Sequence, residues 1–295
     1  MRPRASYENS AKLRSLRELC VKAFRLSHLN FKGHVMKFVV KLGGAALENP
    51  ELLQRCARSI AMLAQDGHQV ALVHGGGVQL TKLLAQIGKK SEFVAGLRIT
   101  DAETRDAALM VLGGRVNKSL VAALTQCGQS AMGLTGGDGH VFRARKKKTE
   151  HDLGFVGEIA ATDPKWLDAI WTMGAIPVIS SIALGFDGEY YNINADEMAS
   201  ACAIATKADA LVFLTDVPGV KGADGQVMRW LSLKQIPELE RASVVSGGML
   251  PKLNACKEAL LGGVTRVRIL PAESAGLLPE FSSTRINDGT EVMVA

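Results

Sequence analysis

The stretch Phe38-Val39-Val40-Lys41-Leu42-Gly43-Gly44-Ala45-Ala46-Leu47 is an apolar run that leads directly into a lysine and two glycines. A short unbroken apolar run is typical of a buried parallel strand. Glycines at the carboxyl end of such a strand let backbone N–H groups approach an anion closely, and Lys41 adds a positive charge. The stretch therefore indicates a phosphate site, although by itself it is equally typical of a strand that ends in an ordinary glycine turn.

A second glycine-rich turn follows the next predicted strand. Asn49-Pro50-Glu51 starts a helix over about residues 50–66, because a capping side chain, an early proline and an early acid all favour a helix start. An apolar strand at 70–73 then leads into His74-Gly75-Gly76-Gly77 and a helix to about Ile87. The carboxyl ends of parallel strands lie at one edge of an open sheet, where ligands bind. Two such turns in succession favour an anion site more strongly than one.

The best-known glycine motifs are absent from the sequence. There is no Gly-x-x-x-x-Gly-Lys-Ser/Thr of a P-loop enzyme, and no Gly-x-Gly-x-x-Gly follows a strand to bind a dinucleotide. The run His74 to Gly77 resembles the oxyanion loop of an α/β-hydrolase, but the chain has no Gly-x-Ser-x-Gly elbow to supply a nucleophile. We interpret His74 as a packing or hydrogen-bonding residue at the strand end rather than a base, because no partner for it is in view.

Composition and charge narrow the class of protein. The 295 residues are 47% hydrophobic, enough for one large α/β domain or two lobes. Residues 1–35 carry eight Lys/Arg against Glu8 and Glu18, which equals the whole net charge of +6, so the rest of the chain is balanced. This distribution does not support a nucleic-acid-binding face. The five cysteines lie far apart without a Cys-x-x-Cys pair, so neither disulfides nor zinc are indicated.

Nothing in the sequence indicates export or membrane insertion. No run approaches the roughly 18 consecutive apolar residues of a membrane helix, and the N-terminus lacks a secretory signal, so we predict a cytoplasmic protein without a membrane partner. In the basic leader, Leu13, Leu16, Cys20 and Phe24 lie at roughly helical spacing. An amphipathic helix there could dock on another subunit or an anionic surface. A disordered extension, or a translation start at Met36, is the alternative.

Polar residues at later strand ends are further candidates for the site. Arg98, in the turn Gly96 to Asp101, precedes a helix capped by Thr100 or Asp101. It can fork onto a carboxylate or form a surface ion pair. The residues Asn192, Asn194 and Asp196 alternate in a predicted extended segment and so should share one face, either as helix caps or as ligand groups.

The second half of the chain repeats the pattern of strand and polar turn. Strands are predicted at about 131–134, 175–179, 210–214, 264–270 and 291–294, with the basic run 143–148 as the solvated face of a hairpin. The strand 210–214 leads into Thr215-Asp216-Val217-Pro218-Gly219-Val220. Farther on, Gly247-Gly248-Met249-Leu250-Pro251-Lys252 places a second lysine beside glycines before a helix, either as a site residue or as a solvated lysine on a flexible loop.

In this order the motifs resemble those of the amino acid kinase family, from about Met36 to the C-terminus. The lysine-glycine turn at Lys41 and the segment 215–220 are shared widely in the family. The segments 96–101 and 192–196 are more specific and are similar to those of members that phosphorylate the side-chain carboxylate of N-acetyl-L-glutamate in arginine biosynthesis. The resemblance implies an α/β fold, a three-layer α/β/α sandwich around a mainly parallel sheet. It also implies a lobe for the acyl amino acid (36–208) and a lobe for ATP (209–295), after the basic extension (1–35).

Carried over to this sequence, the resemblance implies a role for each motif residue. Lys41 and Lys252 would stabilise the transition state of phosphoryl transfer while Asp196 orients them. Backbone N–H groups for the moving phosphoryl group would come from Gly43, Gly44, Gly75 and Gly76. The acyl amino acid would be held by Gly76, Gly77, Arg98 and Asn192. The nucleotide site would be lined by Thr215, Asp216, Val217, Gly219, Val220 and Met249, with Mg²⁺ arriving on ATP rather than at a metal site of the protein.

Two other functions fit the same residues. One is another acyl-phosphate-forming kinase of the family, acting on aspartate, carbamate or a carrier-linked amino acid; Arg98 and Asn192 favour a free acylated α-amino acid instead. The other is a non-catalytic nucleotide or amino-acid sensor, which would not need both lysines and Asp196. The resemblance implies at least a homodimer. A hexamer and inhibition by arginine stay open, because Leu270-Pro271-Ala272 replaces the family's Asp-Gly-Arg and both features depend on the leader helix.

Overall fold

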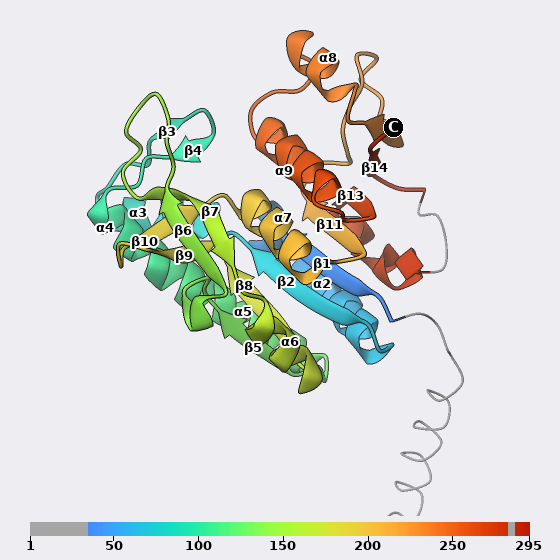
Figure 1. Ribbon diagram of the computed structural model, residues 1–295, viewed down its shortest axis with the longest axis horizontal. Helices are drawn as coiled ribbons and strands as arrows, with labels where there is room; N and C mark the ends of the chain where they lie inside the picture. Colours follow the sequence, from blue (N-terminus) through green and yellow to red (C-terminus); the bar gives the residue numbers. More distant parts are fainter. Residues whose placement is uncertain (1–34, 283–286) are drawn as a thin grey trace, which may run out of the picture. The chain divides into compact units, whose positions relative to one another are not determined.

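The strand β1 (Lys37–Leu42) lies inside an eight-stranded sheet of order β12-β14-β13-β11-β1-β2-β8-β5 (Figure 1). The computed structural model describes residues 35–282 and 287–295, so the predicted leader helix lies outside the described residues. Residues Met36–Ala295 form one unit, and the sheet runs through both predicted lobes. The lobe boundary at 208 therefore stays a prediction.

The sheet is mainly parallel, as predicted. Its other strands are β2 (Gln69–His74), β5 (Ala131–Leu134), β8 (Ile176–Ser180), β11 (Ala210–Thr215), β12 (Trp230–Ser232), β13 (Arg266–Pro271) and β14 (Thr290–Met293). Every neighbouring pair is parallel except β13 with β14. The carboxyl ends of β1, β2 and β11 therefore meet at one edge, which places both glycine-rich turns and the turn at Thr215 together.

Side chains of β1 alternate between two hydrophobic cores, one on each face of the sheet. Phe38, Val40 and Leu42 pack on the first face, which is covered by α2 (Pro50–Gln65), α3 (Gly77–Gln86), α4 (Ala102–Ala108), η2 (Leu109–Val116) and α5 (Asn117–Gln126). Val39 packs on the second face, which is covered by α6 (Lys165–Thr172), α7 (Ala195–Thr206) and α9 (Met249–Leu261). The three-layer sandwich is confirmed. By the same alternation Lys41 faces α7 and α9.

Four strands outside the main sheet pair in a closed ring of order β10-β7-β6-β9. They are β6 (Phe142–Lys146), β7 (Val156–Thr162), β9 (Ile182–Gly185) and β10 (Tyr190–Ile193), and the predicted basic hairpin is β6 with β7. A short hairpin of β3 (Phe93–Val94) and β4 (Leu97–Arg98) carries Arg98. The remaining elements are η1 (Gly44–Leu47), η3 (Asp138–His140), α8 (Ile236–Arg241) and η4 (Ala272–Ser282).

Local signals start the helices where the sequence predicts. The side chain of Asn49 accepts hydrogen bonds from the backbone N–H groups of Glu51 and Leu52 at 3.0 and 3.1 Å, as a cap of α2. Of the two predicted caps of α4, Asp101 is the one used, since it accepts from Thr104 N at 2.9 Å. The side chain of Thr100 instead donates to the carbonyl of Arg98 at 2.8 Å, which fixes the turn before the helix.

One helical stretch, Ala102–Gln126, is long and apolar enough to cross a membrane, with a mean hydropathy of 1.3 over its most apolar window. Half of that window is buried inside the fold. Val111, Leu112, Val116 and Leu120 all belong to the core on the first face of the sheet. Packing therefore accounts for the apolar composition of this stretch, because a core helix passes the same test of length and hydropathy.

Phe38→Ala tests the first core. Phe38 is fully buried and packs edge-on against Phe281 at 6.0 Å between ring centroids. We expect the substitution to lower the free energy of unfolding by about 3–5 kcal/mol in urea titrations, because truncating a buried aromatic leaves a cavity. The control Met173→Ala removes a side chain that is 65% exposed. It should change the free energy of unfolding by less than about 0.5 kcal/mol. Equal unfolding midpoints for the two variants would contradict this packing.

Candidate active site

Three charged side chains from distant parts of the sequence meet at the carboxyl edge of β1. The Nζ atom of Lys41 lies 2.9 Å from Oδ1 of Asp196, and the Nζ atom of Lys252 lies 2.9 Å from Oδ2 of the same carboxylate. Asp196 belongs to the first turn of α7 and Lys252 to the first turn of α9, two helices that lie side by side (Figure 1). The structure thus brings together the three residues predicted to be catalytic.

The cluster carries an excess positive charge at a site that is almost fully shielded from solvent. Asp196 and Lys252 are each only 7% exposed. Burial alone would raise the pKa of Asp196, but the two ammonium groups outweigh it and hold that pKa at about 2. Burial and the charge of Lys41 lower the pKa of Lys252, which Asp196 partly restores. One carboxylate between two lysines leaves attraction for an anion at this edge of the sheet.

The predicted shared face of Asn192, Asn194 and Asp196 fails for Asp196, while Asn192 and Asn194 both lie on extended backbone. The helix α7 begins at Ala195, so the alternation of an extended chain ends before Asp196 is reached. Asn194 is the helix cap and accepts from the N–H groups of Asp196 and Glu197 at 2.8 and 3.3 Å. Asn192 stays on β10 and donates to Thr100 Oγ1 at 3.3 Å. The segment therefore contains both a cap and candidate ligand groups, separated by the change from strand to helix.

The surroundings favour glycine at two positions of the turns, most strongly at Gly76. A Cβ atom on Gly43 would lie 2.8 Å from Nζ of Lys41, so this glycine leaves room for the lysine to fold back over the turn. Gly76 has a φ of 154°, and a Cβ atom there would lie 2.5 Å from the side chain of Leu112. Gly75 N donates to Leu42 O at 3.4 Å, which ties the second turn to the first.

A cavity of about 170 Å³ adjoins the second turn. It is lined by Gly75, Gly76, Gly77, Arg98 and Asn192 among the predicted residues. Asn194, a predicted cap or ligand group, also lines it. Sequence reasoning missed other lining residues, because no local motif marks them: Leu80, Phe93, Leu112, Val156 and Ser181. The cavity thus combines a few polar groups with an apolar wall, which is typical of a small-molecule site.

Arg98 is a buried cation without an acidic partner in the described part of the chain. It is 7% exposed, and its Nη2 atom donates to Gly77 O at 2.9 Å and to Thr81 Oγ1 at 2.8 Å. The guanidinium also lies 4.6 Å from the centroid of the Phe93 ring. Burial lowers its pKa. The structure does not support a surface ion pair here, and a fixed guanidinium that lines a cavity suits a ligand carboxylate.

The segment after β11 lies next to the first glycine turn. A Cβ atom on Gly44 would lie 3.4 Å from the carboxylate of Asp216, whose Oδ1 atom accepts from Thr215 Oγ1 at 3.1 Å. Farther along, Val220 is fully buried and its N–H donates to Thr290 Oγ1 at 2.8 Å, which anchors the segment on β14. Gly219 packs against the same threonine, while Val217 is half-buried and Met249 begins α9. Their part in nucleotide binding stays a prediction.

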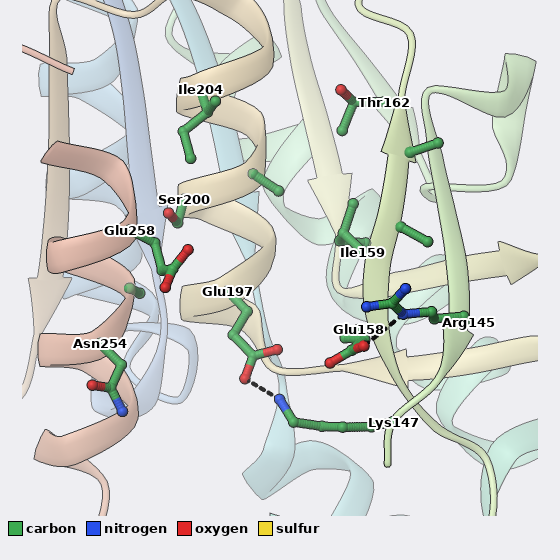
Figure 2. A pocket seen from close by; sticks show the side chains of 14 residues that line it. Arg145, Lys147, Glu158, Ile159, Thr162, Glu197, Ser200, Ile204, Asn254 and Glu258 are labelled. Atoms are coloured by element: carbon green, nitrogen blue, oxygen red, sulfur yellow. Dashed lines mark hydrogen bonds and ion pairs between the residues drawn. The ribbon is translucent and has the colours of Figure 1, made fainter. Parts of the chain in front are cut away.

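A larger hollow of about 600 Å³ lies between the β6–β7 hairpin and the helices α7 and α9 (Figure 2). Four of its charged groups are already paired: Arg145 with Glu158 at 2.6 Å within the hairpin, and Lys147 with Glu197 of α7 at 2.5 Å. None of the predicted site residues lines it. The smaller cavity beside Arg98 is therefore the candidate site. Among the described residues no three His, Cys, Asp or Glu side chains are grouped to hold a metal ion.

The chain is similar to known proteins over most of its length. The Amino acid kinase family model matches residues 36–271. An acetylglutamate kinase from Acidobacterium capsulatum is 74% identical over 260 residues, covering 88% of this chain and 100% of the relative. An acetylglutamate kinase from Koribacter versatilis is 55% identical over 258 residues, covering 88% and 99%.

Solved structures share the fold. N-acetylglutamate synthase from Neisseria gonorrhoeae, complexed with coenzyme A and N-acetyl-glutamate, superposes with a TM-score of 0.77 at 26% identity, over 88% of this chain and 60% of that chain. Carbamate kinase from Giardia lamblia, bound to AMP-PNP, gives a TM-score of 0.65 at 17% identity, over 88% and 99%, and so shows the fold alone. From the family match and the identity to the two relatives, the chain belongs to the amino acid kinase family.

Proposed function

We propose that the protein transfers the γ-phosphoryl group of ATP to the side-chain carboxylate of N-acetyl-L-glutamate in the cytoplasm, as a step of arginine biosynthesis. The product would be N-acetyl-L-glutamyl 5-phosphate. The observation that carries the proposal is the bridge of Lys41 and Lys252 by Asp196 at the edge of β1, beside a cavity lined by Arg98. The acetylglutamate kinases to which the chain is similar support the same acceptor.

The chemistry needs charge stabilisation rather than a base. A side-chain carboxylate has a pKa near 4.3 and is already ionised at neutral pH, so its oxygen can attack the γ-phosphorus directly. The bond from that phosphorus to the β–γ bridging oxygen breaks as ADP leaves. The obstacle is the repulsion between two anions, and positioned positive groups are what phosphoryl transfer mainly asks of a protein. Lys41, Lys252 and the N–H groups of Gly43, Gly44, Gly75 and Gly76 would supply them.

Asp196 would act on the lysines and not on the substrate. Both of its carboxylate oxygens already face an ammonium group at 2.9 Å, and the side chain is almost fully buried. Without this counter-charge, the two ammonium groups at this edge would repel each other, and Lys252 would lose its proton more readily. Asp196 therefore holds both lysines close together while leaving a net positive charge for the phosphoryl group.

The acyl amino acid would occupy the cavity beside the second glycine turn. Arg98 would pair with its main-chain carboxylate, since no acid among the described residues competes for that guanidinium. Asn192 and the backbone of Gly76 and Gly77 would hold the remaining polar groups, and Leu80 lies on the apolar wall of the same cavity. This arrangement favours a free acylated α-amino acid over carbamate, which has no α-carboxylate to bind Arg98.

MgATP would bind on the other side of β1, along the segment that follows β11. The lining residues would be Thr215, Asp216, Val217, Gly219, Val220 and Met249, with Mg²⁺ carried by the nucleotide phosphates. Residues 36–208 would then form the acyl-substrate lobe and residues 209–295 the nucleotide lobe, with transfer where β1 meets β11. We propose that the protein assembles as a homodimer, because the resemblance to the family implies one.

A panel of acids tests the acceptor. We expect the purified protein with MgATP and hydroxylamine, which traps acyl phosphates, to give product with N-acetyl-L-glutamate and little with aspartate, carbamate or unacetylated glutamate. Product formed only from aspartate or carbamate would overturn the proposed acceptor. A protein that binds ATP but gives no product with any acid would instead support a sensor.

Lys41→Ala and Lys252→Ala test the two cations. We expect each to lower kcat by at least about a hundredfold, the scale of losing one preorganised transition-state donor. Two matched controls lie on the same elements and away from the cluster: Lys37→Ala on β1, where Lys37 pairs with Asp168 at 3.5 Å, and Lys257→Ala on the exposed side of α9. Near-normal turnover of either site variant would remove that lysine from the mechanism.

A further inference from the structure

The ring of His74 links the second glycine turn to the helix layer on the first face of the sheet. His74 ends β2 and is fully buried. Its Nδ1 atom lies 2.8 Å from the carbonyl oxygen of Gly75, and its Nε2 atom lies 3.0 Å from Nδ2 of Asn117, where η2 passes into α5. Both ring nitrogens are therefore occupied within the protein, and neither is free to take a proton from a substrate.

The surroundings of Asn117 decide which of its side-chain atoms faces the ring. Its Nδ2 atom also lies 2.9 Å from Val178 O and 3.3 Å from Leu134 O, while its Oδ1 atom accepts from Lys118 Nζ at 3.2 Å. A carbonyl oxygen can only accept a hydrogen bond, so the amide NH₂ group must point toward these carbonyls and toward the ring. Space for this amide comes from Gly133, where a Cβ atom would lie 1.8 Å from Oδ1 of Asn117.

The orientation of Asn117 in turn selects one tautomer of His74. Because Asn117 donates to Nε2, that nitrogen must be the acceptor, and the ring proton must sit on Nδ1. Nδ1–H then donates to the carbonyl of Gly75. Burial lowers the pKa of His74 to about 4, against the effect of the Gly75 hydrogen bond and with a contribution from Lys41 and Lys118, so the ring is neutral at physiological pH.

A fixed Gly75 carbonyl determines where the next N–H points. The C=O of one residue and the N–H of the next lie in one plane and point in opposite directions across a trans peptide. With the Gly75 oxygen held at the His74 ring, the N–H of Gly76 points away from the ring, and Gly76 lines the cavity. Gly76 O accepts from Leu80 N at 2.9 Å at the start of α3, while Gly76 N donates to no acceptor within residues 35–282 and 287–295.

We propose that His74 and Asn117 are positioning residues for phosphoryl transfer: Asn117 selects the Nδ1-protonated tautomer of His74, and His74 turns the Gly75–Gly76 peptide so that Gly76 N–H faces the transferred group. This inference rests on the proposed function. It assigns a role to the histidine of the glycine turn without making it a base, and it extends the site by one layer into η2 and α5. His74 acts through the peptide and touches neither substrate.

Three variants separate positioning from a purely structural role. In His74→Asn the side-chain amide nitrogen takes the place of Nδ1 and can still donate to Gly75 O, whereas His74→Leu removes both ring contacts. Asn117→Leu removes the contact at Nε2 and leaves the one between Nδ1 and the Gly75 carbonyl. We expect His74→Leu to lower kcat by at least about tenfold, which is less than the effect of losing a whole transition-state donor. The KM for MgATP should stay within about twofold of the wild-type value. His74→Asn should recover a substantial part of kcat, and Asn117→Leu should fall between wild type and His74→Leu.

The kinetics are measured well below the thermal midpoint of each variant, so that a loss of stability alone leaves kcat unchanged. Wild-type kcat in folded His74→Leu would overturn the inference. A wild-type protein that is inactive with every acid of the panel would overturn the proposed function instead, so the two failures are distinguishable. If His74→Leu does not fold, Asn117→Leu takes its place: the inference predicts a kcat below that of the wild type, and a wild-type kcat in folded Asn117→Leu would overturn it.

A second measurement does not depend on activity. In protein labelled with ¹⁵N-histidine, we expect the resonances of His74 to show a protonated Nδ1 and an unprotonated Nε2 between pH 6 and 8, with no titration near the ordinary value of about 6.5. In Asn117→Leu, where only the Gly75 carbonyl still favours Nδ1–H, the fraction of the Nε2-protonated tautomer should rise. A protonated Nε2 in the wild type, or a midpoint near pH 6.5, would overturn the inference.

Discussion

The carboxylate of Asp196 between two ammonium groups is the interaction on which the rest of the site depends. Buried charges are costly unless they are paired, and here each oxygen of one carboxylate faces one lysine at 2.9 Å. The pairing requires β1, α7 and α9 to meet at one edge of the sheet. The alternation along β1 makes this meeting possible, because it turns Lys41 toward the face that α7 and α9 cover. The packing of the sandwich and the chemistry of the site are therefore set by the same geometry.

Around this cluster the described part of the chain supplies fixed dipoles and cations. The neutral, fully buried ring of His74 belongs to the scaffold of the glycine turn. Arg98, held by Gly77 and Thr81, would balance a second anionic group of the proposed acceptor. Such an arrangement suits an acceptor that is already ionised, in which the main barrier is the approach of two negative charges.

Much of the fold and site could be predicted because the signals are local. Unbroken apolar runs marked the parallel strands, Asn49 marked a helix start, and lysines beside glycines marked the cluster. What failed or was missed depends on distant contacts. The face shared by Asn192 and Asp196 was mispredicted because helix formation at Ala195 interrupts the alternation. The pairing of Asn117 with His74, which spans 43 residues of sequence, has no local pattern, and neither does the apolar wall of the cavity.

The most direct measurement of this account is the pH dependence of kcat for Asp196→Asn. Removing the carboxylate charge leaves the charge of Lys41 unopposed beside Lys252, which lowers the pKa of Lys252 further. The account predicts a kcat lower by at least about tenfold at neutral pH and an alkaline limb of the pH profile moved to lower pH. Glu197→Gln, which alters the adjacent acid paired with Lys147, should keep the wild-type profile. A folded Asp196→Asn enzyme with wild-type kcat and an unmoved alkaline limb would contradict the account.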